Sequence, residues 1–113
     1  MSELRLYKEV YDLMQWIMNK TDGFPKSKRF SLGVRLENTA LNLVVACSRY
    51  PYAGQKSRVA AIISRSFDEL KILLHVANDI RVLGRSGYAH VLSRIELIGP
   101  MIGALQKSCK SGE

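Results

Sequence analysis

The sequence predicts an all-α protein, an up-down-up-down four-helix bundle, and three observations carry this prediction. Apolar residues recur at three- and four-residue spacing in four segments of the chain. Short turn signals that contain glycine or proline separate these segments. No segment alternates apolar and polar residues with the period of two that strands show. Four amphipathic helices joined by short connections form such a bundle by default.

The first two helices are expected on either side of a turn at Gly23 and Pro25. The apolar stripe of the first helix comprises Tyr7, Val10, Tyr11, Met14, Ile17 and Met18. The second helix opens near Ser27 or Ser31, and its stripe comprises Leu36, Ala40, Leu43, Val44 and Cys47. A second apolar flank, Leu32, Leu41 and Val45, predicts that this helix is the most enclosed one.

The third helix is expected after a turn over residues 49–54. Its apolar seam steps by four and three residues, as in a helical bundle. The seam comprises Val59, Ile63, Ser66, Leu70, Leu73, Ala77 and Ile80, and it is widened by Phe67 and Leu74. Gly84 is expected to cap the C-terminus of this helix in a left-handed conformation.

The fourth helix is expected from about Tyr88 to Leu105, with Pro100 inside it. Proline lacks a backbone donor and clashes with the preceding turn, so we expect a kink or break near residues 98–100. Gly99 and Gly103 predict close approach of a neighbouring helix, in the same chain or in another subunit. The bundle is therefore expected over residues 1–108, with a flexible tail over residues 109–113.

The net charge of +7 is concentrated in one part of the 113-residue chain. Residues 23–67 contain a single acid, Glu37, and eight bases: Lys26, Lys28, Arg29, Arg35, Arg49, Lys56, Arg58 and Arg65. A local excess of this kind favours a polyanionic partner, nucleic acid first among them.

The bundle topology sorts the bases between its two ends. The turns that follow the first and third helices share one end, which places Lys26, Lys28 and Arg29 near Arg81 and Arg85. The opposite end collects Arg49, Lys56 and Arg58 beside Lys107 and Lys110. Clusters of like charge suit phosphate contacts; alternatively they are solvated helix ends. Tyr50 and Tyr52 either stack on bases or pack a turn.

We predict that the protein is not an enzyme and needs no cofactor or metal. His75 and His90 are the only histidines, and neither has acids placed to form a metal-binding face. The sequence contains no phosphate-binding loop and no dinucleotide fingerprint. Cys47 lies in an apolar run, which is typical of a buried, unreactive thiol.

A cytoplasmic location is expected. The N-terminus has no basic segment followed by an apolar one, so it does not resemble a signal peptide. The longest run without charge, residues 38–48, is too short to span a bilayer.

Several motifs carry a resemblance to a known family. They are Tyr7, Tyr11-Asp12-Leu13, Trp16, Phe24-Pro25-Lys26, Arg29-Phe30-Ser31-Leu32-Gly33, the run from Arg35 to Leu41, and the run from Ile98 to Gly103. The chain resembles the four-helix bundle family of 23S ribosomal RNA intervening-sequence proteins and of accessory variability determinant (Avd) proteins of diversity-generating retroelements. The intervening-sequence branch carries an Asn-Ile-Ala-Glu-Gly-like segment where this chain has Val45 to Arg49, which favours the Avd branch.

The resemblance implies a homopentameric barrel that is basic at one mouth and binds RNA and DNA with little sequence specificity. It also implies a partner, the reverse transcriptase of the same element, during mutagenic retrohoming. By position, the basic surface of the family falls on Lys26, Arg29, Arg81 and Arg85, whereas Pro100 departs from the charged or polar residue that is commoner there.

Two alternatives stay open at this point. The first is a protein-interaction bundle of the intervening-sequence type, whose basic end docks an acidic protein. The second is attachment to a membrane surface, which requires large apolar residues exposed opposite a basic helix face. We expect the core to use the apolar stripes fully, which disfavours the membrane alternative.

Overall fold

The computed structural model describes the backbone of residues 2–112 and the side chains of residues 3–109. The described residues contain four long helices: α1 (Ser2–Thr21), α3 (Val34–Arg49), α4 (Lys56–Asp79) and α5 (Arg85–Gly112). A single helical turn, α2 (Lys26–Lys28), and a π-helical turn, η1 (Arg29–Gly33), lead directly into α3, and a 3₁₀ turn, η2 (Tyr50–Tyr52), follows it. The described residues form no strand, so the all-α prediction is confirmed.

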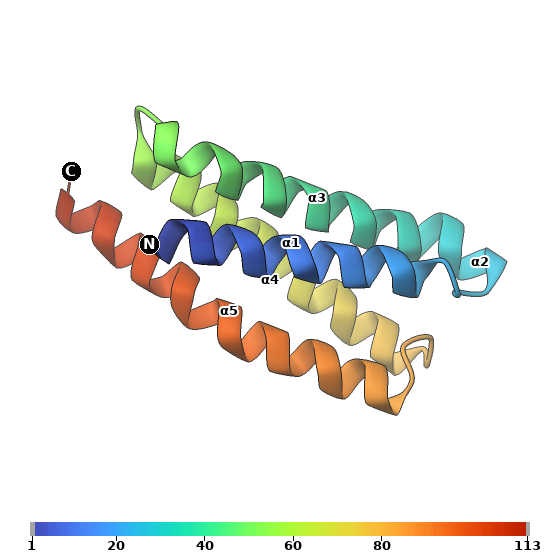
Figure 1. Cartoon of the computed structure of the whole chain (residues 1–113). Coiled ribbons are helices and arrows are strands. Elements are labelled where there is room, and N and C mark those ends of the chain that lie inside the picture. The colour runs from blue at the N-terminus through green and yellow to red at the C-terminus, as the bar shows by residue number, and fades with distance from the viewer. Residues whose placement is uncertain (1, 113) are drawn as a thin grey trace.

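The helices form an elongated up-down-up-down bundle of 46 × 23 × 19 Å (Figure 1). Each helix packs on its neighbours in sequence, and α1 packs on α5, which closes the ring of contacts. One end of the bundle holds α2 and the connection between α4 and α5, as predicted from the topology. The other end holds the connection between α3 and α4 together with both chain termini.

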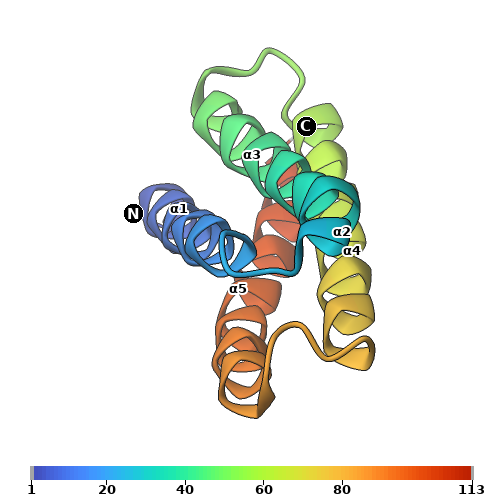
Figure 2. The same cartoon turned by 90° about the vertical axis from the view of Figure 1, so that its right-hand side faces the viewer.

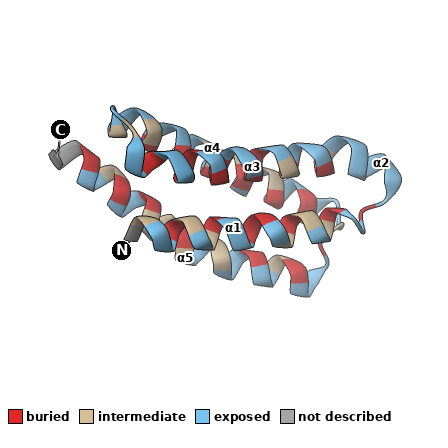
Figure 3. Cartoon of the chain, turned by 45° about the horizontal axis from the view of Figure 1, so that its top comes forward, coloured by how far each residue is buried: buried red, intermediate tan, exposed pale blue. Residues whose placement is uncertain are grey.

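The core follows the three- and four-residue spacing of each helix (Figure 3). The predicted stripe of α3 is confirmed, since all five of its residues are buried. In α4 the predicted seam is confirmed at Ile63, Leu70 and Ala77, and Phe67 and Leu74, expected to widen it, are buried as well. The seam positions between these are wrong. The buried residues are Ala60, Ile63, Phe67, Leu70, Leu74 and Ala77. Val59, Ser66 and Leu73 are half-buried and Ile80 is exposed, because α4 must face α3 and α5 at once.

The core does not use all apolar residues, contrary to the expectation. Leu41 and Val45 on α3 are exposed, so α3 is not fully enclosed. Ile72 and Val76 on α4 and Ile80 directly after it form a second exposed apolar stripe, with the three residues spaced by four.

The end of α4 differs from the prediction that Gly84 caps it. The N–H of Val82 donates to the Ala77 carbonyl at 3.1 Å, and the N–H of Arg81 donates to the Asn78 carbonyl at 3.0 Å. This pair of bonds is a Schellman motif, and Arg81 occupies its left-handed position with φ 65°. Gly84, also at positive φ, instead directly precedes α5, and its carbonyl accepts the N–H of Tyr88 at 3.1 Å.

Helix α5 runs without a break through Pro100, so of the two expected outcomes the break does not occur, and a kink near residues 98–100 stays a prediction (Figure 1). The proline ring is exposed, where it displaces no core side chain. A Cβ atom on Gly99 would lie 3.8 Å from the Phe67 ring, which is an ordinary contact distance. A Cβ atom on Gly103 would meet no neighbouring atom within 4 Å. Close approach at these glycines is therefore not made within this chain.

The helix continues past the predicted start of a tail at residue 109. Cys109 is buried, and its thiol donates to the Gln106 carbonyl at 3.2 Å. Residue 113 and the side chains of residues 110–112 lie outside the described part of the chain, so flexibility there stays a prediction.

No described helix is long and apolar enough to cross a membrane.

Candidate nucleic-acid interface

Five of the predicted site residues lie at the end of the bundle that carries α2, which we call the α2 end (Figure 2). Lys26, Lys28 and Arg29 come from α2 and the start of η1. Arg81 comes from the connection between α4 and α5, and Arg85 is the first residue of α5. All five are exposed. The segments that carry them are far apart in sequence, and the antiparallel topology alone brings them to one end.

The local fold of α2 holds its bases on a short, regular turn. Pro25 precedes the turn, and its carbonyl accepts the N–H groups of Lys28 at 2.8 Å and of Arg29 at 2.9 Å. The N–H of Val34 then reaches back to the Arg29 carbonyl, five residues earlier, which makes the π turn. These bonds fix the backbone that carries the three bases.

One acid partly offsets these bases. The Arg29 guanidinium lies 3.5 Å from the Asp22 carboxylate, and both side chains are at least half exposed. An exposed pair at this distance contributes little and leaves the arginine available to another anion.

Lys20 is a base at the same end that the sequence analysis did not select. Its ammonium lies 5.9 Å from the centroid of the Trp16 ring on α1. A Cβ atom on Gly87 of α5 would lie only 3.1 Å from the Lys20 side chain. The side chain therefore crosses from α1 to α5, and the small residue at position 87 was the only sequence signal for it.

At the opposite end of the bundle, Lys56 holds the turn between α3 and α4. Its ammonium donates to the Tyr50 carbonyl at 3.0 Å and to the Pro51 carbonyl at 3.1 Å. It also lies 4.8 Å from the centroid of the Tyr50 ring, which is buried. Lys56 and Tyr50 thus pack the turn. Of the two alternatives left open for Tyr50, packing of the turn is confirmed, whereas Lys56, predicted as a binding residue, also has this structural role.

Tyr52 is the most exposed large apolar residue of this end, at 89% of its maximum. It lines a shallow hollow of about 590 Å³, which we call the Tyr52 hollow. The hollow is lined by Ser48, Arg49, Tyr52, Ala53, Gly54, Gln55, Arg58 and Val59. Arg49 and Arg58 are exposed and make no ion pair with a described residue. Of the other predicted bases here, Lys107 is exposed, and the side chain of Lys110 lies outside the described residues.

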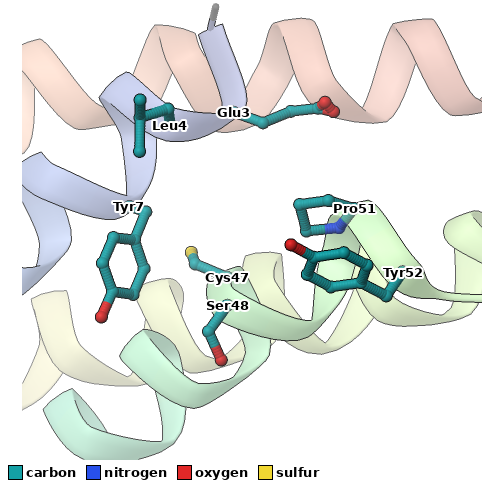
Figure 4. A pocket seen from close by; sticks show the side chains of 7 residues that line it. All are labelled: Glu3, Leu4, Tyr7, Cys47, Ser48, Pro51 and Tyr52. Atoms are coloured by element: carbon teal, nitrogen blue, oxygen red, sulfur yellow. The ribbon is translucent and has the colours of Figure 1, made fainter.

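Tyr52 also borders a second hollow of about 420 Å³, between the start of α1 and the end of α3 (Figure 4). Leu4 and Tyr7 line its α1 side, and Cys47 and Pro51 line the side that faces them. Burial raises the pKa of the Cys47 thiol to about 12, so the group is a neutral thiol at physiological pH. The prediction of a buried, unreactive Cys47 agrees with this environment.

The histidines make surface contacts. His75 Nδ1 lies 3.4 Å from the Tyr88 hydroxyl, and His75 Nε2 lies 3.4 Å from the Asp79 carboxylate. The His90 ring lies against Trp16, with 5.3 Å between centroids. Among the residues described, no three His, Cys, Asp or Glu side chains are grouped to hold a metal ion.

The fold and its surface define a class of protein: a basic four-helix bundle with exposed basic residues at both ends. The family model described as bAvd-like matches residues 4–109, almost the whole chain. The chain belongs to the bAvd-like family, which confirms the resemblance to the Avd branch. Proteins of this type are accessory rather than catalytic. A search of curated proteins finds no match to the chain.

Proposed function

We propose that this protein is a nucleic-acid-binding accessory subunit, which binds RNA and DNA with little sequence specificity. It acts with the reverse transcriptase of a retroelement, as its membership of the bAvd-like family suggests. The observation that carries the proposal is the set of exposed bases at the α2 end: Lys26, Lys28, Arg29, Arg81 and Arg85. Phosphate contacts from such a set give affinity without reading base sequence.

The pairing of the acids supports this proposal. Several acids have a partner elsewhere on the bundle: Glu9 pairs with Arg94, Glu69 with Arg35, and Asp68 with Lys71. The carboxylate of Glu37 accepts a hydrogen bond from the Thr21 hydroxyl. None of these contacts involves a base of the α2 end, so they do not offset the positive charge there. A phosphate backbone relieves the repulsion within such a cluster.

The backbone of Arg81 supports it further. A left-handed conformation costs a residue with a Cβ atom roughly 1–2 kcal/mol, and glycine avoids this cost. The chain nevertheless has arginine at the left-handed position of the Schellman motif, with its side chain exposed. Strain of this kind at an exposed base agrees with a role in binding.

We also propose that the protein assembles as a homo-oligomer, a pentameric ring in line with the resemblance to Avd proteins. Val34, Leu41 and Val45 share one exposed face of α3, and Phe30 just before them is 67% exposed. The stripe of Ile72, Val76 and Ile80 on α4 is a separate apolar surface. Two unlike apolar surfaces suit a head-to-tail contact between copies, which closes into a ring when the rotation permits.

The binding proposal is tested by charge reversal at the α2 end. The variant combines Lys26→Glu, Arg29→Glu and Arg85→Glu and leaves Arg81 unchanged, because substitution there also alters the backbone energy. We expect its affinity for RNA and for duplex DNA to fall, with a salt dependence that is shallower by roughly one phosphate contact per base. Fluorescence anisotropy at several salt concentrations measures both quantities.

The matched control combines Arg5→Glu, Lys8→Glu and Arg65→Glu, three exposed bases outside the α2 end. It changes the net charge by the same amount, so it accounts for non-local electrostatics. Equal losses in the two variants would contradict the α2 end as the binding surface. Binding by neither variant nor wild type would contradict the proposed function itself.

Light scattering in high salt after nuclease treatment tests the assembly proposal. A mass near five chains supports the ring, and the variant Val34→Glu with Val45→Glu should then reduce it. A monomeric wild-type protein would contradict the ring.

A further inference from the structure

We propose that the Tyr52 hollow binds one unpaired nucleotide of a single-stranded nucleic acid, with the base stacked on Tyr52 and the adjacent phosphates held by Arg49 and Arg58. This inference rests on the proposed nucleic-acid binding and adds a second site at the opposite end of the bundle. It also adds a preference for single strands, which phosphate contacts at the α2 end do not supply.

The ring of Tyr52 is exposed to solvent and is not packed against the core. At 89% exposure it lies between two hollows and borders both of them. An exposed aromatic ring on a fixed backbone offers a stacking surface to any base, because every base has a π-face. The volume of about 590 Å³ is in the range of pockets that hold small molecules.

The backbone beneath the ring is fixed by contacts within the turn. Lys56 donates to the carbonyl oxygens of Tyr50 and Pro51, and the Ala53 N–H donates to the Tyr50 carbonyl at 3.2 Å. The buried Tyr50 anchors the same turn in the core. Tyr52 therefore projects from a rigid support, which lowers the entropy lost when a base stacks on it.

The charge around the hollow is of one sign. No acid occurs in residues 38–67, which include every residue that lines the hollow. Arg49 closes α3 and Arg58 lies in the first turn of α4, so the two guanidinium groups come from different helices on either side of the turn. Glu3 lines the second hollow together with Tyr52 and does not line the Tyr52 hollow. Guanidinium groups suit phosphate oxygens because their donors are planar and can bind two oxygens at once.

A stacking site of this kind distinguishes single strands from duplexes. In a duplex the faces of the bases are covered by their neighbours, so an external ring reaches only a terminal pair. In a single strand a base can rotate out and stack on the ring, a contact typical of single-strand binding. Tyr52 should therefore contribute to the affinity for single strands and hardly at all to the affinity for long duplexes.

The test compares a labelled oligothymidylate with a long DNA duplex in fluorescence anisotropy. Tyr52→Leu should weaken binding to oligothymidylate by about 5- to 100-fold and leave duplex binding within about twofold. Tyr52→Phe keeps the ring and should retain most of the affinity. Tyr11→Leu removes another exposed tyrosine and is the matched control, expected to have no effect. Far-UV circular dichroism checks that each variant is folded.

The arginines are tested in the same assay. Arg58→Gln should weaken oligothymidylate binding more than Arg65→Gln, which removes the same charge two turns further along α4. An oligothymidylate that carries 5-iodouracil should crosslink under ultraviolet light to the peptide that contains Tyr52, as read by mass spectrometry.

Three outcomes would overturn the inference. If Tyr52→Leu leaves the ratio of single-strand to duplex affinity unchanged, this site is contradicted. A crosslink that maps to another peptide also contradicts it. In both cases the wild-type protein still binds nucleic acid. A wild-type protein that binds neither probe at low salt contradicts both this inference and the proposed function.

Discussion

The N–H of Val82 donates to the carbonyl oxygen of Ala77 at 3.1 Å, and this bond closes α4 around Arg81 in the left-handed position. Most helices that end in this way have glycine there, since glycine has no Cβ atom to clash. At this position the chain has Arg81, a base of the α2 end, in place of the glycine that the left-handed backbone favours.

Arg81→Gly should therefore stabilise the fold and weaken nucleic-acid binding at the same time. Relief of the left-handed strain should raise the free energy of unfolding by about 1 kcal/mol. The gain should appear as a melting temperature higher by about 4 °C in circular dichroism. Gly84→Ala is the control, because that glycine also has positive φ and should lose stability. An Arg81→Gly variant that is less stable than wild type would contradict this account of the turn.

Lys56→Met should destabilise the fold with little direct effect on binding at the α2 end. The substitution removes two hydrogen bonds to the Tyr50 and Pro51 carbonyls and the contact with the Tyr50 ring. We expect a loss of about 1–2 kcal/mol in urea unfolding, since each net hydrogen bond contributes roughly 1 kcal/mol. Lys26→Met, at an exposed base without such contacts, should leave stability nearly unchanged. A larger loss of stability for Lys26→Met than for Lys56→Met would show that Lys56 does not hold the turn.

Pro100→Ala should stabilise the protein. Pro100 is exposed inside a continuous helix and cannot donate to the carbonyl of Glu96. Alanine restores that bond, and the propensity difference predicts a gain of about 1–3 kcal/mol. Thermal unfolding at a fixed protein concentration measures it, because the proposed self-association would make the midpoint depend on concentration. A clear loss would instead indicate that the proline shapes α5 for a contact outside this chain.

Cys47 should resist alkylation in the folded protein until strongly alkaline pH. Its pKa of about 12 lies above the ordinary value of 9.0, because burial disfavours the thiolate. In a Cys109→Ser background, iodoacetamide should react with the native protein at pH 8 far more slowly than with the urea-unfolded chain. Complete, rapid labelling of the native protein at pH 8 would contradict the buried position of Cys47.

The same raised pKa gives the sign of a stability change. The unfolded chain releases the Cys47 proton near pH 9, whereas the folded chain retains it until about pH 12. The contribution of this group to stability is therefore complete below pH 9 and decreases as pH rises through this interval. Cys47→Ala should remove that part of the alkaline dependence.

The sequence was sufficient to predict the helices and the end of the bundle to which each basic segment belongs. In α3 only one helix face contains Leu36, Leu43 and Cys47 together, so the sequence was enough to predict which face is buried. The seam of α4 allows two phases, through Ser66 or through Phe67, and spacing alone does not choose between them. The choice depends on how α4 sits against α3 and α5 together, which is a tertiary property.

The candidate site could be predicted less completely, for reasons visible in particular residues. Lys56 and Arg58 are two positions apart and look equivalent in the sequence, yet Lys56 bonds to the turn and Arg58 lines the Tyr52 hollow. Tyr50 and Tyr52 differ in the same way, one buried and the other exposed. The direction of a side chain in an irregular turn depends on backbone bonds that no periodicity reveals. Lys20 was missed because it reaches its place by crossing to α5.

The salt dependence of nucleic-acid affinity tests the central claim most directly. For a duplex DNA of arbitrary sequence, five phosphate contacts from the α2 end predict that log Kobs falls with log salt concentration at a slope of about −4 to −5. Two unrelated sequences should give the same slope and nearly the same affinity. A slope between 0 and about −1, or no binding at low salt, would contradict the claim that this bundle binds nucleic acid through the bases of the α2 end.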